Sequence, residues 1–279
     1  MSWGQSTYIS PGDLGELELP ARRIPVFARA DVVVAGGGPA GLAAAASAAR
    51  SGASTLLLER YGFLGGNLTA ASVGTMCGLY MKTDSGFDLA VKGFAEELAE
   101  RLKSGGAAMG PLPFKESAVL LYVPWAAKRA ADAFVEEEPN LRLLLHSRIT
   151  DVRMSGDRIE ALVVASKRGP VGITGDVFID CTGDADVSYY AGVPTEIGPP
   201  GMRQFASMQF FIENVDGTAA FSSISKLPDL IAEYGSHLSR DGGALIPTGR
   251  KGEFIGAMTR VAHDGDPIDS CDLTEITWG

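Results

Sequence analysis

The sequence lacks several features that would point to common functional classes. It has only three cysteines, Cys77, Cys181 and Cys271, and no CxxC pair, so it indicates neither a zinc site nor a vicinal redox pair. A sparse, odd set of cysteines is typical of reduced thiols in a cytosol. Basic residues number 24 against 34 acidic ones, which gives a net charge of −10. This balance argues against nucleic acid and against an anionic membrane surface as partners.

Long apolar runs are also missing. The longest apolar-looking stretch, residues 31–49, is interrupted by a glycine cluster and by Pro39, so it does not predict a membrane span. The N-terminus has neither the basic start nor the apolar core of a signal peptide. We therefore expect a protein of the cytoplasm. The apolar content of 46% over 279 residues is ample for a buried core, in one large domain or two smaller ones.

The clearest pattern is a β-α-β unit near the N-terminus. Residues 31–35 form a β-branched run typical of a buried parallel strand, and residues 42–51 are rich in alanine and favour a helix. Gly52 stands where a helix C-cap glycine is expected, and residues 54–59 predict a second buried strand. The unit spans about thirty residues, the size that such units require.

A glycine motif, Gly36-x-Gly38-x-x-Gly41, joins the first strand to the helix. Gly36 allows the tight turn, Gly38 lets the backbone approach a pyrophosphate, and Gly41 lets the helix pack against the sheet. Pro39 and Ala40 lie at the helix start, where backbone N–H groups and the helix dipole favour bound phosphates. The strand before the motif and the helix after it are the context that a dinucleotide site requires.

Glu59 ends the second predicted strand. An acidic side chain at this point accepts hydrogen bonds from the hydroxyls of an adenosine ribose. An ordinary carboxylate at a strand end is the alternative. Because the glycine motif precedes it, the ribose role is the favoured interpretation.

Together with segments later in the chain, this unit resembles a known family. The chain resembles the flavin-dependent oxidoreductases of the glutathione-reductase superfamily, and more narrowly the branch called FAD-dependent oxidoreductase. The segments that match are residues 24–26, residues 31–41, Glu59-Arg60, Gly65-Gly66-Asn67 with the following Leu68-Thr69, and Thr182-Gly183-Asp184. Those after Glu59 favour a flavin over a nicotinamide, so a plain NAD dehydrogenase is disfavoured. The resemblance covers most of residues 24–275 and implies FAD as the cofactor.

The resemblance also assigns cofactor contacts beyond the first unit. The loop with Arg60, Gly65, Gly66 and Asn67 would pass close to the pyrophosphate and the flavin ring. A simple turn is the alternative for the glycine pair. Ile149 falls where the family's strand offers backbone hydrogen bonds to adenine, and its side chain would be core in either case.

The segment Thr182-Gly183-Asp184 ends a strand in the second flavin motif of the resembled family. There Gly183 would permit close approach of the cofactor. Asp184 would lie near the ribityl and phosphate region, or it would cap the helix that follows.

Catalytic residues are not assigned by the sequence, and it indicates no metal site. Cys77 lies downstream of the glycine pair, where a thiol could exchange electrons with a flavin, but a small buried side chain is the favoured reading. Tyr80 could donate a hydrogen bond to substrate. Gln204 lies in a segment that resembles the start of the family's second domain, which covers the flavin face.

The expected fold is α/β. A Rossmann-type FAD-binding domain with a parallel central sheet and a β-hairpin covers residues 30–195, after an N-terminal arm over 1–29. An α+β substrate-side region covers 196–279. Further elements are predicted as helices over 88–103, 126–138 and 228–234, a hairpin of 158–165 with 170–178, and a strand over 208–215.

Relatives of the resembled family carry a further stretch after the segment that matches residues 272–274. Its late helix faces the flavin pyrimidine, and its dipole stabilises negative charge there. This sequence stops at Gly279, before that stretch. The favoured explanation is that a separate polypeptide completes the flavin site. A truncated chain and a degenerate member of the family are the alternatives. We expect an oxidoreductase that moves hydride from a small organic substrate to FAD within a hetero-oligomer. A flavin monooxygenase and a non-catalytic FAD-binding or electron-transfer subunit remain open.

Overall fold

The structure, a computed structural model, describes residue 15 and residues 17–114, 116–199, 202–224, 226–234, 243–263, 265–271 and 276. Most of residues 1–16 of the predicted arm, and residues 272–274, lie outside these ranges. The chain forms two compact units. The larger contains Ile24–Thr195 and Ile246–Phe254, and the other contains Met1–Arg23, Glu196–Leu245 and Ile255–Gly279.

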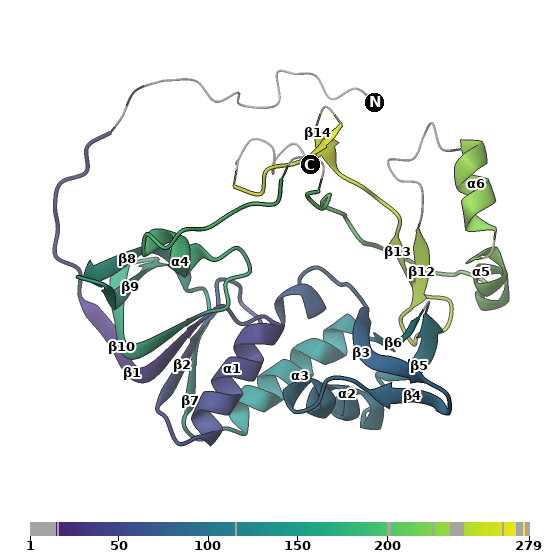
Figure 1. Ribbon diagram of the computed structural model, residues 1–279, viewed down its shortest axis with the longest axis horizontal. Helices are drawn as coiled ribbons and strands as arrows, with labels where there is room; N and C mark the ends of the chain where they lie inside the picture. The colour runs from purple at the N-terminus through teal and green to yellow at the C-terminus, as the bar shows by residue number, and fades with distance from the viewer. Residues whose placement is uncertain are drawn as a thin grey trace. The chain divides into compact units, whose positions relative to one another are not determined.

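A six-stranded sheet organises the larger unit, with the strand order β7-β2-β1-β10-β9-β8 (Figure 1). The strands are β1 (Val26–Ala35), β2 (Thr55–Leu58), β7 (Leu141–Leu144), β8 (Arg148–Ser155), β9 (Arg158–Ser166) and β10 (Gly169–Asp180). The first four strands in this order run parallel to one another, and β9 is antiparallel to both of its neighbours, β10 and β8. The α/β class, the parallel sheet and the predicted hairpin are therefore confirmed.

Strand β1 is longer than the predicted run of residues 31–35. It begins at Val26, because its first half pairs in parallel with β10 from Gly172 onward. The side chains of Val26 and Phe27 are exposed there, so apolar periodicity gave no signal for this part.

Apolar side chains of β1 and β2 alternate between two layers, as the two-residue period of a strand requires. Val33 and Leu56 pack with residues of β8, β9 and β10. Val34 and Leu57 pack on the opposite face against α1 (Pro39–Arg50) and α3 (Pro124–Glu136). Because both faces of the sheet are covered at β1 and β2, the sequences of these strands are uninterrupted apolar runs. This burial fixes the end of β1, from which the glycine motif begins.

Helix α1 confirms the predicted β-α-β unit. It begins at Pro39, which lies in its first turn, and it ends at Arg50. Gly52 has a φ of +91° and its N–H donates to the carbonyl of Ala49, so it terminates the helix as predicted. Arg50 also pairs with Glu97 and Glu138, which ties α1 to α2 (Phe94–Ser104) and to the end of α3.

A second sheet in the larger unit was not predicted. Its order is β4-β3-β6-β5, from β3 (Thr75–Thr83), β4 (Gly86–Leu89), β5 (Ala108–Phe114) and β6 (Ser117–Tyr122). The sequence prediction missed it because Gly78, Pro111 and Pro113 break the apolar alternation. Helix α2 is shorter than the predicted 88–103, because Leu89 pairs with Tyr80 of β3 and leaves the helix window.

The remaining described elements are short. They are the 3₁₀ helix η2 (Gly66–Leu68), α4 (Asp186–Tyr190), α5 (Gly217–Ile224), α6 (Leu227–Tyr234), β11 (Phe210–Ile212), β12 (Ala244–Pro247), β13 (Phe254–Ala257), β14 (Ala262–His263) and β15 (Asp266–Pro267). Helix α6 agrees with the predicted 228–234, whereas β11 covers only part of the predicted 208–215. Among the described residues, no helix is both long and apolar enough to cross a membrane.

Candidate functional site

Two glycines of the first motif are required by the protein's own packing. Gly36 has a φ of +102°, and a Cβ atom there would lie 2.2 Å from the carbonyl oxygen of Cys181 at the end of β10. A Cβ atom on Gly41 would lie 1.7 Å from the carbonyl oxygen of Gly36. Real side chains do not come this close to backbone, so any residue larger than glycine would displace the β1–α1 turn.

Gly38 differs from its neighbours in the motif. It is the N-cap residue of α1, and no side chain caps the helix N-terminus. A Cβ atom at Gly38 would have open space, with the nearest atom 3.9 Å away at the Cα of Gly66. The protein's packing therefore does not demand glycine at this position. What glycine provides is close access to the free N–H groups of the helix start, which suit a phosphate.

Glu59 is held beside this loop. Its side chain is buried, with 5% of the residue exposed. Its Oε2 accepts a hydrogen bond of 2.8 Å from the N–H of Gly37, and its Oε1 accepts one of 2.8 Å from the N–H of Tyr61. A carboxylate oxygen can accept more than one hydrogen bond, so both oxygens keep capacity for hydroxyl donors.

Gly37 is a site residue that the sequence prediction missed. A Cβ atom there would lie 2.5 Å from the Cδ2 of Leu64 and 3.0 Å from the Oε2 of Glu59. Glycine at this position lets its N–H reach the buried carboxylate. The available signal was the unbroken run Gly36-Gly37-Gly38, of which the motif uses only two members.

The second glycine loop packs directly on the first. The N–H of Gly65 donates to the carbonyl of Gly37 over 2.8 Å, and a Cβ atom on Gly66 would lie 2.9 Å from the Cα of Gly38. Both Gly65 and Gly66 have positive φ, at +108° and +50°. Asn67, in η2, is exposed. The loop thus builds one wall of the region around Gly38, which a simple surface turn would not do.

The end of β10 forms a compact polar corner around Asp180, another residue that the sequence prediction missed. Thr182 donates from its hydroxyl and its N–H to one carboxylate oxygen, and Ser188 donates from the same two groups to the other. Partial burial alone would raise the pKa of Asp180, but these four hydrogen bonds outweigh it and lower the pKa. The sequence signal was only an acidic residue at a strand end.

Asp184 does not cap α4, so that alternative is wrong. The N-cap residue is Ala185, and it is the hydroxyl of Thr182 that accepts the N–H of Asp186 over 2.9 Å. Gly183 has a φ of +99° with no atom within 4 Å of a Cβ placed there. Asp184 and Gly183 are both exposed, and this edge of the corner is open.

Arg60 is brought close to this corner. Partial burial and the neighbouring carboxylates of Asp184 and Asp180 raise the pKa of Asp186, while Arg60 and Arg148 oppose the shift. The guanidinium of Arg60 also lies 4.8 Å from the ring centroid of Tyr61. The residues after β2 and after β10 therefore share one electrostatic neighbourhood.

The other candidates fall in several places. Ile149, on β8, packs its side chain against the apolar layer of β1 and β2, as expected. Tyr80 is buried between β3 and its neighbours, and its hydroxyl accepts a hydrogen bond of 2.7 Å from Lys103. Gln204 is exposed and belongs to the other compact unit. Cys77 is exposed on β3, contrary to the buried side chain favoured from sequence.

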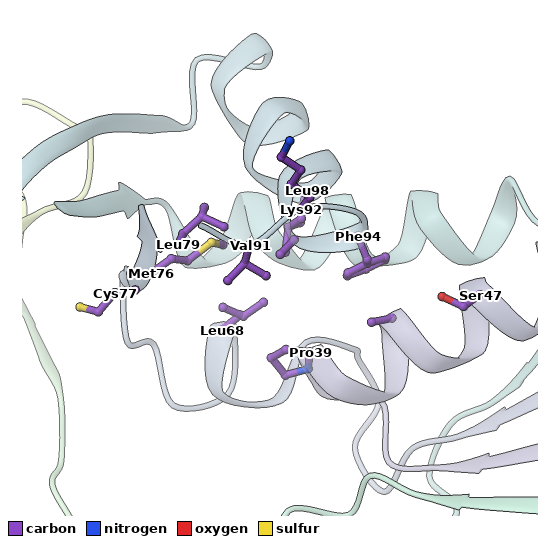
Figure 2. A pocket seen from close by; sticks show the side chains of 13 residues that line it. Pro39, Ser47, Leu68, Met76, Cys77, Leu79, Val91, Lys92, Phe94 and Leu98 are labelled. Atoms are coloured by element: carbon purple, nitrogen blue, oxygen red, sulfur yellow. The ribbon is translucent and has the colours of Figure 1, made fainter. Parts of the chain in front are cut away.

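An apolar groove of about 500 Å³ begins beside the glycine motif. It lies between α1, η2, β3 and α2, with Pro39 and Leu68 on one side and Phe94 and Leu98 on the other (Figure 2). Cys77 lies at one end of the row of lining side chains in this view. No group of three or more potential metal ligands is found among the described residues.

Comparison with known proteins identifies the family. Residues 31–263 match the family described as FAD dependent oxidoreductase, and the chain belongs to it. A curated relative, the thiamine thiazole synthase of Aeropyrum pernix, is 27% identical over an alignment 261 positions long that covers 84% of this chain and 87% of that protein.

Two solved structures share the fold. The p-nitrophenol 4-monooxygenase PnpA from Pseudomonas putida DLL-E4 has a TM-score of 0.50 at 12% identity, over 90% of this chain and 61% of that one. BexE, described in connection with oxidation during BE-7585A biosynthesis, has a TM-score of 0.54 at 17% identity, over 87% of this chain and 45% of that one. The chain therefore spans less than two thirds of either structure.

The cofactor is FAD, and the protein is a flavin-dependent oxidoreductase. The geometry around Gly38 fits this cofactor. An uncapped helix N-terminus with open space before it suits the pyrophosphate, and the buried carboxylate of Glu59 suits the hydroxyls of a ribose.

Proposed function

We propose that this chain carries an active flavin site that removes hydride from a small organic substrate. The observation that supports this most directly is the construction around Gly38. Two glycine loops, joined through Gly37 and Gly65, leave a helix N-terminus open and hold the carboxylate of Glu59 beside it. When bound, FAD supplies the two-electron acceptor chemistry, and the protein supplies position and electrostatics.

The roles of individual residues follow from this arrangement. Gly38, Pro39 and Ala40 open the helix N-terminus toward the pyrophosphate, and Glu59 accepts hydrogen bonds from the adenosine ribose. Ile149 offers backbone groups to the adenine. Such a set orients a dinucleotide without any reacting side chain.

The second set of contacts would serve the flavin half. Gly65, Gly66 and Asn67 line the path toward the ring, and Arg60, with the Thr182-Gly183-Asp184 corner, faces the ribityl and phosphate region. The exposure of Asp184 and the open space at Gly183 support this, since the fold itself uses neither. Glu59-Arg60 and Gly65–Asn67 also support placing the chain with the flavoproteins of the glutathione-reductase type.

The substrate in this proposal is small and largely apolar. The groove beside Pro39 has a volume of about 500 Å³, within the range of roughly 300–1,000 Å³ that is common for small-molecule pockets. Its lining is mostly aliphatic and aromatic, with Lys92 as the one charged member. Cys77 at its end remains a candidate for contact with substrate.

We also propose that a second polypeptide completes the site in a hetero-oligomer. Three large apolar side chains near the end of the larger unit, Val177, Tyr189 and Val193, are each more than half exposed, which agrees with such an interface. Intact-mass analysis of the native assembly tests it. A single species of 29.2 kDa with tightly bound flavin would contradict it.

Anaerobic spectroscopy tests the enzymatic proposal. The native assembly should show flavin absorbance that bleaches when a substrate from a panel of small, largely apolar alcohols and amines is added. Oxygen uptake coupled to hydroxylated product would instead support a monooxygenase. Flavin that no substrate reduces, while a partner alone turns over, would support a non-catalytic FAD-binding or electron-transfer subunit.

A variant pair links the spectrum to the site. Glu59→Gln should lower FAD occupancy at least tenfold, because an amide cannot accept from both the Gly37 and Tyr61 N–H groups and from a ribose. Glu136→Gln is the matched control, since Glu136 is exposed on α3. Equal occupancy in the two variants would remove the ribose role from Glu59.

A further inference from the structure

The loop over residues 60–64 joins Glu59 to the second glycine loop. At its start, Glu59 accepts a hydrogen bond from the N–H of Gly37, and just after its end the N–H of Gly65 donates to the carbonyl of the same glycine. Between these two points the loop is neither helix nor strand. The placement of its side chains therefore depends on the packing of those side chains on one another and on neighbouring elements.

Four side chains, three from this loop and one from α3, form a row of successive contacts. The guanidinium of Arg60 lies 4.8 Å from the ring centroid of Tyr61, and this ring is stacked on Phe63 with the centroids 5.7 Å apart and 10° between the planes. The ammonium of Lys128, on α3, lies 3.6 Å from the ring centroid of Phe63. The quadrupole of an aromatic ring attracts a cation over its face, so the row has a favourable charge at each end.

Lys128 directs its charge to this ring and not to a carboxylate. In the part of the chain that the structure describes, Lys128 forms no salt bridge. Lys128 and Phe63 are both half-buried, whereas the next residue on the helix, Arg129, is exposed. Partial removal from water strengthens the attraction between a cation and a ring.

The loop is also held from the turn between β7 and β8. The N–H of His146 donates to the carbonyl of Tyr61 over 3.0 Å, and a Cβ atom on Gly62 would lie 2.8 Å from the Cε1 of the His146 imidazole. The imidazole thus lies directly on the backbone of Gly62. Leu64, which is fully buried, packs against Gly37 at the far end of the loop. Arg60 is the exposed end of a loop that is otherwise fixed.

We propose that Lys128 is a positioning residue for the flavin site, and that it acts through Phe63 and Tyr61 on Arg60. This rests on the proposed function, in which Arg60 faces the ribityl and phosphate region. A long side chain that becomes ordered only on binding reduces affinity through its lost rotamer freedom. The row that begins at Lys128 orders the Arg60 guanidinium before the cofactor binds, so this loss is smaller.

The first test measures FAD affinity by fluorescence titration of the flavin-free native assembly. Lys128→Met keeps most of the aliphatic stem but removes the charge, and it should weaken FAD binding about fivefold. Lys128→Arg keeps a cation over the ring, and its affinity should stay within about twofold of the wild type. Arg129→Met is the matched control, because it removes a charge from the exposed neighbouring position, and it should leave affinity unchanged.

A double-mutant cycle separates positioning from a general loss of stability. Arg60→Met should weaken FAD binding at least as much as Lys128→Met does. Adding Lys128→Met to Arg60→Met, or to Phe63→Leu, should have no further effect, because residues that act through one row of contacts are not additive. A residue that only stabilised the fold would lower affinity by the same factor in every background. Additive losses, or wild-type affinity in Lys128→Met, overturn the inference.

The same variants distinguish this inference from the function on which it rests. Weak FAD binding in Arg60→Met together with wild-type binding in Lys128→Met would overturn the role of Lys128 alone. Wild-type binding in Arg60→Met would overturn the proposed role of Arg60 and the inference together. Substrate bleaching of the flavin in the unmodified assembly tests the enzymatic proposal separately, because the role of Lys128 concerns cofactor affinity and not turnover.

Discussion

The Gly36–Gly41 loop and the Thr182–Asp184 corner are both proposed to approach the cofactor, but the protein packs them differently. In the first, protein atoms fill the space beside Gly36 and Gly41, so those glycines serve the fold. In the second, nothing lies beside Gly183, and Asp184 is exposed. Glycine therefore serves close packing at Gly36 and Gly41, whereas at Gly183 it leaves open space in which a cofactor could lie. Only the contacts around each glycine, and not the residue type, distinguish these two roles.

The largest effect is expected for Gly41→Ala. The added methyl would lie 1.7 Å from the carbonyl oxygen of Gly36. The free-energy cost of this steric overlap is larger than the gain of about 1 kcal/mol that alanine brings through its higher helix propensity. We expect a loss of more than about 3 kcal/mol of unfolding free energy, measured by urea denaturation, together with loss of FAD. A variant of normal stability would show that the β1–α1 turn can move.

Asp180→Asn should cost less, about 1–2 kcal/mol at neutral pH. The amide group would place N–H donors against donors of Thr182 or Ser188. Folding lowers the pKa of Asp180. The stabilisation is therefore fully present above the pKa of the unfolded chain, about 4, and it is lost as the pH falls through the pKa of the folded state. The variant's deficit should therefore shrink below about pH 4 in urea titrations. A deficit that stayed constant would mean that the charge of Asp180 contributes nothing.

The sequence predicted the features that local spacing determines, and it missed those that depend on contacts between distant parts of the chain. Gly36, Gly41 and the apolar runs of β1 and β2 were predictable, because local sequence spacing dictates the turn and the burial. Asp180 was missed because its partners are set by the path of the chain into α4. Capping of α4, one of the two alternatives for Asp184, is made by the hydroxyl of Thr182 instead. The sheet of β3 to β6 was missed because its prolines and glycines are tolerated only through long-range pairing.

Gly38→Ala should separate folding from binding. Its Cβ would have open space, so only the poorer N-cap propensity of alanine acts, and we expect a loss of at most about 1 kcal/mol in unfolding free energy. The methyl would stand in front of the helix N-terminus. FAD affinity, measured by fluorescence titration, should fall at least tenfold, which corresponds to about 1.4 kcal/mol. Destabilisation as large as that of Gly41→Ala would erase the distinction between the two glycines.

Asp184→Ala is expected to change stability least, within about 0.5 kcal/mol, because its side chain is exposed and α4 is capped by Thr182 instead. If its carboxylate accepts a hydrogen bond from the ribityl chain, FAD affinity should still fall by about tenfold. The matched change Asp157→Ala, in the exposed turn between β8 and β9, should alter neither quantity. Unchanged FAD affinity in Asp184→Ala would mean that the corner has only a structural role, through Asp180 and Thr182. The proposed difference between the two loops, packing in one and cofactor access in the other, would then be wrong.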